Sequence, residues 1–129
     1  MLYAAAFLVV LLGLAHSWLG ERYLLQRLFR RSELLPKLLG GTEFTKNTLR
    51  FVWHLTTVMA FGFALLMVLI ANDTGHGPAD MANAIGVCLI VSGALPLLYT
   101  RGRHVSWVGL FAAGALCLGW AARQSGGVA

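Results

Sequence analysis

The residues of this 129-residue chain that could do chemistry are polar side chains set in or beside long apolar runs. Arg50, His54 and Thr57 are spaced i, i+4 and i+7, so one face of a helix would carry all three. Ser17 and Glu21 are spaced i and i+4 and would form a second polar stripe. Polar groups in hydrocarbon are costly unless they find partners inside the protein. The spacing therefore predicts that the two stripes face each other, with an ion pair between Glu21 and Arg50 as the first contact.

Three of the four histidines fall at a similar depth in these runs. His16 lies on the face beside the Ser17–Glu21 stripe, and His104 opens the last apolar run. Imidazole binds Zn, Cu, Fe and Ni, and two histidines on facing helices can ligate a haem iron. No established metal motif matches the spacings, so the cofactor stays open between a metal, a haem and none. We predict a ligand-binding cluster that consists of three histidines, one acid and one base: His16, Glu21, Arg50, His54 and His104. Within this cluster, the predicted metal ligands are His16 and His54.

Three classes of function fit this cluster. The leading hypothesis is a protein that binds a small ligand, metal or haem there. A small proton-coupled transporter or exporter is the second, although only Asn83 marks a polar path through the other half of the helices. The third is a structural or assembly protein whose polar groups hold the helices in register. An enzyme fits less well, because the sequence has no evident nucleophile–base pair and no phosphate-binding glycine loop.

Composition decides what kind of protein carries these residues. Apolar residues make up 58% of the chain and charged residues 12%, and the mean hydropathy is +0.73. Soluble domains average about 25% charged residues. The composition excludes soluble, disordered, collagen-like and coiled-coil classes, and it predicts a small integral membrane protein whose main partner is the lipid bilayer.

Four apolar runs divide the chain, at residues 2–19, 49–71, 81–99 and 105–122. Each is close to the ~20 residues that a helix needs to cross a bilayer. The segments after the second and third runs are short, which favours antiparallel neighbours. We therefore predict a single membrane domain over residues 1–129, all-α, folded as a four-helix bundle. Glycine, alanine and serine recur in the last two runs, which predicts close helix packing and a face for a homo-oligomer.

The basic residues predict the orientation. Eight of the ten lie between the first and second runs or between the third and fourth, and a ninth, Arg50, lies at the start of the second run. The connection from residue 72 to residue 80 has none. The positive-inside rule then places both termini outside and the two basic connections in the cytoplasm. The net charge of +5 is thus a topology signal, and we expect no nucleic-acid partner because no soluble basic domain exists.

The first connection has a pattern of its own. From Tyr23 to Leu35, leucines recur with helical period, and Arg27, Arg30 and Arg31 lie mostly on the other side. This predicts an amphipathic interfacial helix between the first two membrane helices, with the arginines on anionic lipid headgroups. A solvated face that only fixes topology is the alternative. Thr42, after a Gly-Gly break, is the predicted N-cap of the next helix.

Two stretches of the sequence resemble a family. His16-Ser17-Trp18-Leu19-Gly20-Glu21-Arg22-Tyr23-Leu24-Leu25 and Arg50-Phe51-Val52-Trp53-His54-Leu55-Thr56 are similar to segments of small four-helix membrane proteins of bacteria. Those segments read H-S-x-L-G-E-R-Y-L-L and R-F-x-W-H-L-T. The resemblance covers most of the chain and implies a four-helix fold in a bacterial inner membrane. It implies no chemistry, because no activity is attached to such proteins.

Overall fold

The computed structural model describes residues 1–39, 41–72 and 75–126. These residues form an all-helical structure, as predicted. Four helices are long and apolar enough to cross a membrane, and they span Leu2–Arg30, Thr42–Ala71, Pro78–Tyr99 and Ser106–Ser125. The four apolar runs of the sequence lie within these helices, except for Val105 at the start of the fourth run.

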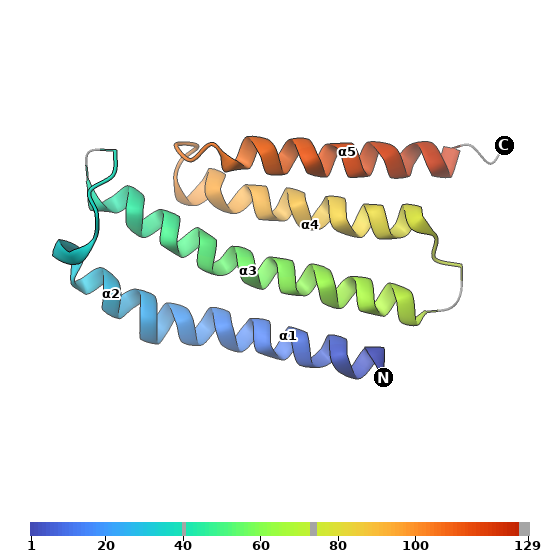
Figure 1. Cartoon of the computed structure of the whole chain (residues 1–129), viewed down its shortest axis with the longest axis horizontal. Coiled ribbons are helices and arrows are strands. Elements are labelled where there is room, and N and C mark those ends of the chain that lie inside the picture. The colour runs from blue at the N-terminus through green and yellow to red at the C-terminus, as the bar shows by residue number, and fades with distance from the viewer. Residues whose placement is uncertain (40, 73–74, 127–129) are drawn as a thin grey trace.

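The first long helix is built from three consecutive segments. The α-helix α1 (Leu2–Leu19) continues into a π-helical stretch, η1 (Gly20–Leu25), and then into α2 (Gln26–Arg30). No separate helix covers Tyr23–Leu35, because η1 and α2 prolong α1 to Arg30 (Figure 1), and the interfacial position of this segment stays a prediction. The helix does not break at Gly20, because the backbone of this residue keeps right-handed helical angles. Its turns are wider in η1, since that stretch is π-helical. The helix ends at Arg30, before the short 3-10 turn η2 (Ser32–Leu34).

The remaining helices differ in length. The helix α3 (Thr42–Ala71) has 30 residues, α4 (Pro78–Tyr99) has 22 and α5 (Ser106–Gly126) has 21. At a rise of about 1.5 Å per residue, α3 is roughly 12 Å longer than α4. Gly41 is the N-cap of α3, and no side chain caps it. The predicted cap, Thr42, is instead the first residue inside the helix.

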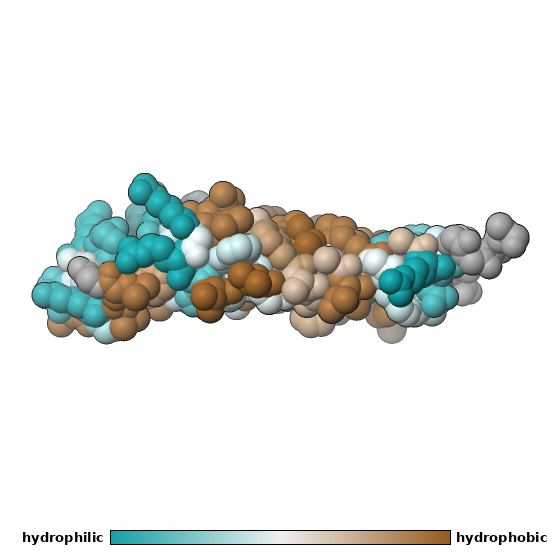
Figure 2. Space-filling view, turned by 90° about the horizontal axis from the view of Figure 1, so that it is seen from above, coloured by the Kyte–Doolittle hydropathy of each residue, from teal (hydrophilic) through white to brown (hydrophobic). Residues whose placement is uncertain are grey.

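The four long helices form a row, and the prediction of a bundle was wrong. Extensive contacts join α1 with α3, α3 with α4, and α4 with α5, so each helix packs on its neighbours along the chain. Figure 1 shows the helices side by side in that order, and Figure 2 shows how thin the row is when seen edge-on. Short connections fix which helices are neighbours, but they do not make a row close on itself.

Charge separates the two ends of the row. One end holds α2, the start of α3 and the turn between α4 and α5, and we call it the basic end. It carries nine basic residues: Arg22, Arg27, Arg30, Arg31, Lys37, Lys46, Arg50, Arg101 and Arg103. Both termini lie at the opposite end (Figure 1). Hydrophilic residues gather at the ends in Figure 2, and hydrophobic residues occupy the middle.

Candidate functional site

The predicted ion pair between α1 and α3 is confirmed. Arg50 Nη2 donates to Glu21 Oε1 at 2.7 Å, and Arg50 Nε donates to Glu21 Oε2 at 3.1 Å. Two parallel bonds of this kind fix the geometry of both side chains, and charge makes each bond stronger than a neutral one. The arginine and glutamate side chains are 32% and 27% exposed. The ion pair is therefore only partly buried.

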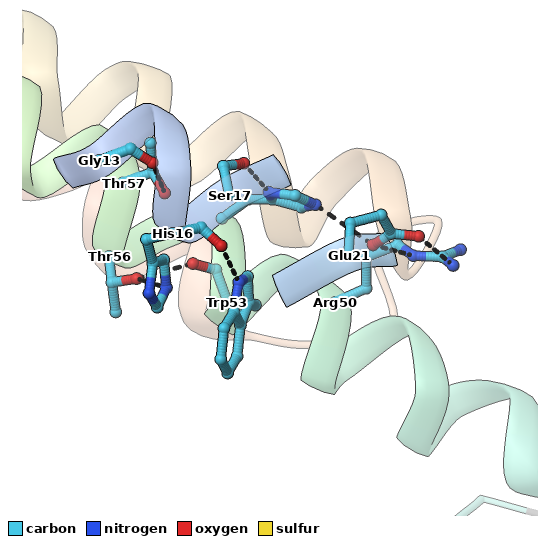
Figure 3. Close-up of polar contacts among 9 residues, drawn as sticks. Gly13, His16, Ser17, Glu21, Arg50, Trp53, Thr56 and Thr57 are labelled. Atoms are coloured by element: carbon cyan, nitrogen blue, oxygen red, sulfur yellow. Dashed lines mark hydrogen bonds and ion pairs between the residues drawn. The ribbon is translucent and has the colours of Figure 1, made fainter. Parts of the chain in front are cut away.

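The imidazole of His54 extends this contact by one helical turn. His54 Nδ1 lies 2.6 Å from Ser17 Oγ, and His54 Nε2 lies 3.5 Å from Glu21 Oε2. We name Ser17, Glu21, Arg50 and His54 the polar clasp. Figure 3 shows the clasp as a continuous line of contacts along the two helices.

The register of two antiparallel helices explains why these residues meet. One turn along the first long helix, from Ser17 in α1 to Glu21 in η1, corresponds to one turn back along α3, from His54 to Arg50. The same register brings Thr57 to Gly13, where the threonine hydroxyl donates to the glycine carbonyl at 3.4 Å. The i, i+4 spacings in the sequence thus become a ladder between the two helices.

His16 does not join the clasp, so the prediction of one cluster was wrong for this residue. Its Nε2 lies 3.0 Å from Thr56 Oγ1, and its ring stacks on Trp53 with centroids 4.3 Å apart. The indole of Trp53 donates to the His16 carbonyl at 3.0 Å. In Figure 3 these side chains lie on the other side of the helix pair from the Glu21–Arg50 contact. Adjacent residues on a helix point about 100° apart, so His16 and Ser17 cannot both face α3 in the same way.

His104 also lies outside the clasp. Its Nδ1 is 2.8 Å from Ser106 Oγ, and its ring packs edge-on against Phe51 with centroids 5.0 Å apart. These contacts order the turn that leads into α5. Two other rings adjoin the clasp: the Arg50 guanidinium carbon lies 5.1 Å from the centroid of the Phe29 ring, and the Tyr99 ring stacks with His54 at a centroid distance of 6.2 Å.

This geometry gives no support to the metal or haem prediction. His16 and His54 bond to different partners on different sides of the α1–α3 contact. Among the residues that the structure describes, no three His, Cys, Asp or Glu side chains come close enough together to hold a metal ion.

In the clasp a hydroxyl contacts an imidazole, which in turn contacts a carboxylate. These are the three groups of a serine hydrolase. Ser17 lies inside a regular helix, however, where the backbone N–H groups are bonded along the helix. No donors are left to stabilise an oxyanion at the serine. Arg50, which could supply a positive charge, is held by Glu21. The arrangement can hold helices together and pass a proton, but it lacks the parts for acyl transfer.

Two aromatic residues at the site carry little signal in the sequence. Trp53 fits the ordinary interfacial tryptophan pattern, and Tyr99 ends an apolar run. The residue that could have indicated the position of Trp53 is Gly20, because a Cβ at that glycine would lie 2.0 Å from the indole nitrogen. A glycine facing a tryptophan across an antiparallel register is recognisable once the register is known.

No family model matches the chain, and no curated protein or solved structure is similar to it. The resemblance to small bacterial membrane proteins therefore stays a prediction based on two motifs.

Proposed function

We propose that this chain is a multi-pass protein of a bacterial inner membrane and that it works as a structural or assembly component there. Four helices of sufficient length and apolarity support the membrane location. The basic end lies opposite the two termini, which supports a cytoplasmic basic end and periplasmic termini. Reporter fusions after Ala129 test the orientation. A reporter that is active only in the cytoplasm would contradict it.

The observation that carries the proposal is the open row. Large apolar side chains are exposed on the row, among them Phe7, Phe63 and Leu116, at 62%, 61% and 75%. A row that buries so little of its own surface must meet lipid or other membrane helices on both faces. The clasp supports the same conclusion, because its charged groups are paired with one another and hold α1 to α3. We infer that the row assembles with a second copy of itself.

Native mass spectrometry of the full chain released from lipid nanodiscs tests this assembly. We expect a fixed stoichiometry above one that persists when the protein is diluted with lipid. A monomer at every protein-to-lipid ratio would overturn the proposal.

Ligand exchange or proton transfer at the clasp is a second candidate. One observation favours it: the 3.5 Å separation of His54 Nε2 from Glu21 Oε2 is longer than a good hydrogen bond. That nitrogen can therefore take another partner or a proton without breaking the Arg50–Glu21 contact. Elemental analysis, an absorption spectrum and pH-dependent flux in vesicles test this candidate. Colourless, metal-free protein with no flux would leave the assembly role alone.

We also propose that Arg27, Arg30 and Arg31 contact anionic headgroups. All three side chains are exposed at the basic end, on α2 and directly after it. Arginines just beyond a membrane helix are attracted to anionic lipid by about 1 kcal/mol each. Replacement of all three by glutamine should weaken co-purification of phosphatidylglycerol without changing the fold.

A further inference from the structure

A polar cavity lies at the basic end, where none of the four clasp residues lines it but Tyr99 borders both the cavity and His54. It has a volume of about 260 Å³ and opens between the start of α3 and the turn that joins α4 to α5. Asn47 and Phe44 line it from α3, Tyr99 from the end of α4, and Arg101 and Arg103 from the turn. Ligand pockets for drug-sized molecules are generally larger, about 300–1,000 Å³, so this cavity suits one small chemical group.

The turn holds Arg101 in an unusual backbone conformation. Its φ is +53°, in the left-handed region that favours glycine. Gly102 N–H donates to Leu97 O at 2.8 Å and Arg101 N–H donates to Leu98 O, the two bonds of a Schellman motif. Glycine is the usual residue at the position that Arg101 occupies. An arginine there is strained, and strained residues of this kind cluster at functional sites.

The donors around the cavity are unequally satisfied. Arg103 donates to the Leu39 carbonyl at 3.0 Å and lies over the Phe44 ring. Arg101 has no side-chain hydrogen bond or ion pair with any residue that the structure describes. The same is true of the Asn47 amide and the Tyr99 hydroxyl. Three donor side chains thus line one cavity without a partner from the described protein.

The acid at the cavity rim does not neutralise these donors. Glu43 contributes to the lining, but its carboxylate is bound by Lys46 at 3.0 Å. The Glu43 side chain is 78% exposed, so its charge is well screened. The two arginines therefore leave the lining net positive.

We propose that this cavity binds a phosphate group. A guanidinium offers two parallel N–H donors that match the oxygens of a phosphate, and Arg101 has both available. Asn47 and Tyr99 would donate to the remaining oxygens, while Arg103 adds charge and holds the rim. The phosphate belongs either to an anionic lipid headgroup or to a small soluble phosphate, because both present the same oxygens to the cavity.

The test uses the full chain in two arms. In the first arm, detergent-purified protein is titrated with inorganic phosphate and binding is followed by ³¹P NMR line width. In the second, protein from phosphatidylcholine nanodiscs with increasing phosphatidylglycerol is examined by native mass spectrometry for bound phosphatidylglycerol. We expect saturable binding in at least one arm, and the arm that saturates identifies the source of the phosphate.

Variants locate the binding in the cavity. Arg101→Gln should raise the Kd about tenfold, which corresponds to the loss of one charge-assisted contact. Arg22→Gln is the matched control, since it removes an exposed arginine at the same end of the row, and it should change the Kd less than about twofold. Arg101→Gly removes the guanidinium while relieving the backbone, so lost binding by a well-folded protein would separate binding from stability. No saturation in either arm, or equal losses for the Arg101 and Arg22 variants, would overturn the proposal.

Discussion

The α4–α5 pair is joined by glycines, whereas the α1–α3 pair is joined by polar side chains. A Cβ at Gly114 would lie 2.9 Å from the Gly86 carbonyl oxygen, so the two backbones approach as closely as the side-chain-free residues allow. Between α1 and α3, the polar clasp and the Thr57–Gly13 bond make the contact instead. Lipid tails are as apolar as leucine, so helices in a membrane gain little from burying apolar side chains against each other. Close packing and hydrogen bonding are the two ways that remain. Glycines bring backbone to backbone between α4 and α5, whereas Gly13 and Gly20 of the first long helix face side chains of α3, beside the hydrogen bonds of the clasp.

This difference predicts what each pair tolerates. The α4–α5 contact should be sensitive to added volume and indifferent to polarity. The α1–α3 contact should be sensitive to lost hydrogen bonds. The variants below test that comparison, each measured by SDS titration of the purified protein in mixed micelles with helicity as the signal.

The largest effect should come from Gly114→Leu. The new side chain would meet the Gly86 backbone and Ile90, and it would push α4 and α5 apart. We expect a loss of about 3 kcal/mol, the upper part of the range for overpacking. Gly109→Leu is the control on the same helix, because nothing lies within 4 Å of its Cβ position. Equal losses for the two variants would show that α4 and α5 are not held by close approach.

Removal of one partner of the ion pair should have the next largest effect. Arg50→Ala leaves the Glu21 carboxylate without its two strongest donors, and the reverse holds for Glu21→Ala. Because both side chains are about one-third exposed or less, we expect losses of about 2 kcal/mol, below the 3–5 kcal/mol of a fully buried pair. The double variant should lose about 1 kcal/mol less than the sum of the single variants. Strictly additive losses would show that the two charges act independently.

Ser17→Ala should cost about 1 kcal/mol, since it removes one hydrogen bond to His54 and little volume. Ser125→Ala is a suitable control, because the Ser125 hydroxyl bonds only within its own helix, to the Ala121 carbonyl. The control should change stability by less than about 0.5 kcal/mol. If Ser17→Ala were as harmless as the control, the His54 contact would contribute nothing to the α1–α3 pair.

The smallest effect belongs to the turn of the α4–α5 pair and has the opposite sign. Arg101→Gly should raise stability by up to about 1 kcal/mol, because glycine adopts a φ of +53° without a steric penalty. Arg101→Ala removes the same guanidinium and keeps the strained backbone, so it should not stabilise the protein. A loss of stability in the glycine variant would mean that the arginine side chain supports the turn.

The sequence was a good guide wherever helical spacing alone decides the outcome. The Glu21–Arg50 pair follows from two i, i+4 stripes that have only each other as polar partners. The location of His16 did not follow, because a residue one step from Ser17 faces sideways, and the sequence does not reveal on which side α3 continues. His16 stacks on Trp53. The sequence did not indicate this contact, because a tryptophan is expected near the membrane interface whether or not it contacts a histidine.

The arrangement of the helices was harder to predict than the helices themselves. Leucine and phenylalanine look the same in sequence whether they meet lipid or another helix, so apolar runs do not distinguish a row from a bundle. The cavity at the basic end was missed for another reason. It depends on the conformation of Arg101 in a tight turn, and a lone arginine between two helices reads as a topology signal.

The π-helical stretch η1 sets the angle, about the helix axis, between the side chains of α1 and those of α2. In this turn Gln26 N–H bonds to the carbonyl of Glu21, five residues back, so the stretch holds more residues per turn than an α-helix. Deletion of one residue between Arg22 and Leu25 would rotate α2 by about 100° and leave Ser17 opposite His54. Such a deletion is thus a single genetic event that re-aims the arginines of α2 around the helix axis without disturbing the residues that fasten α1 to α3. The direction of the α2 arginines can therefore change in evolution independently of the residues that bind α1 to α3.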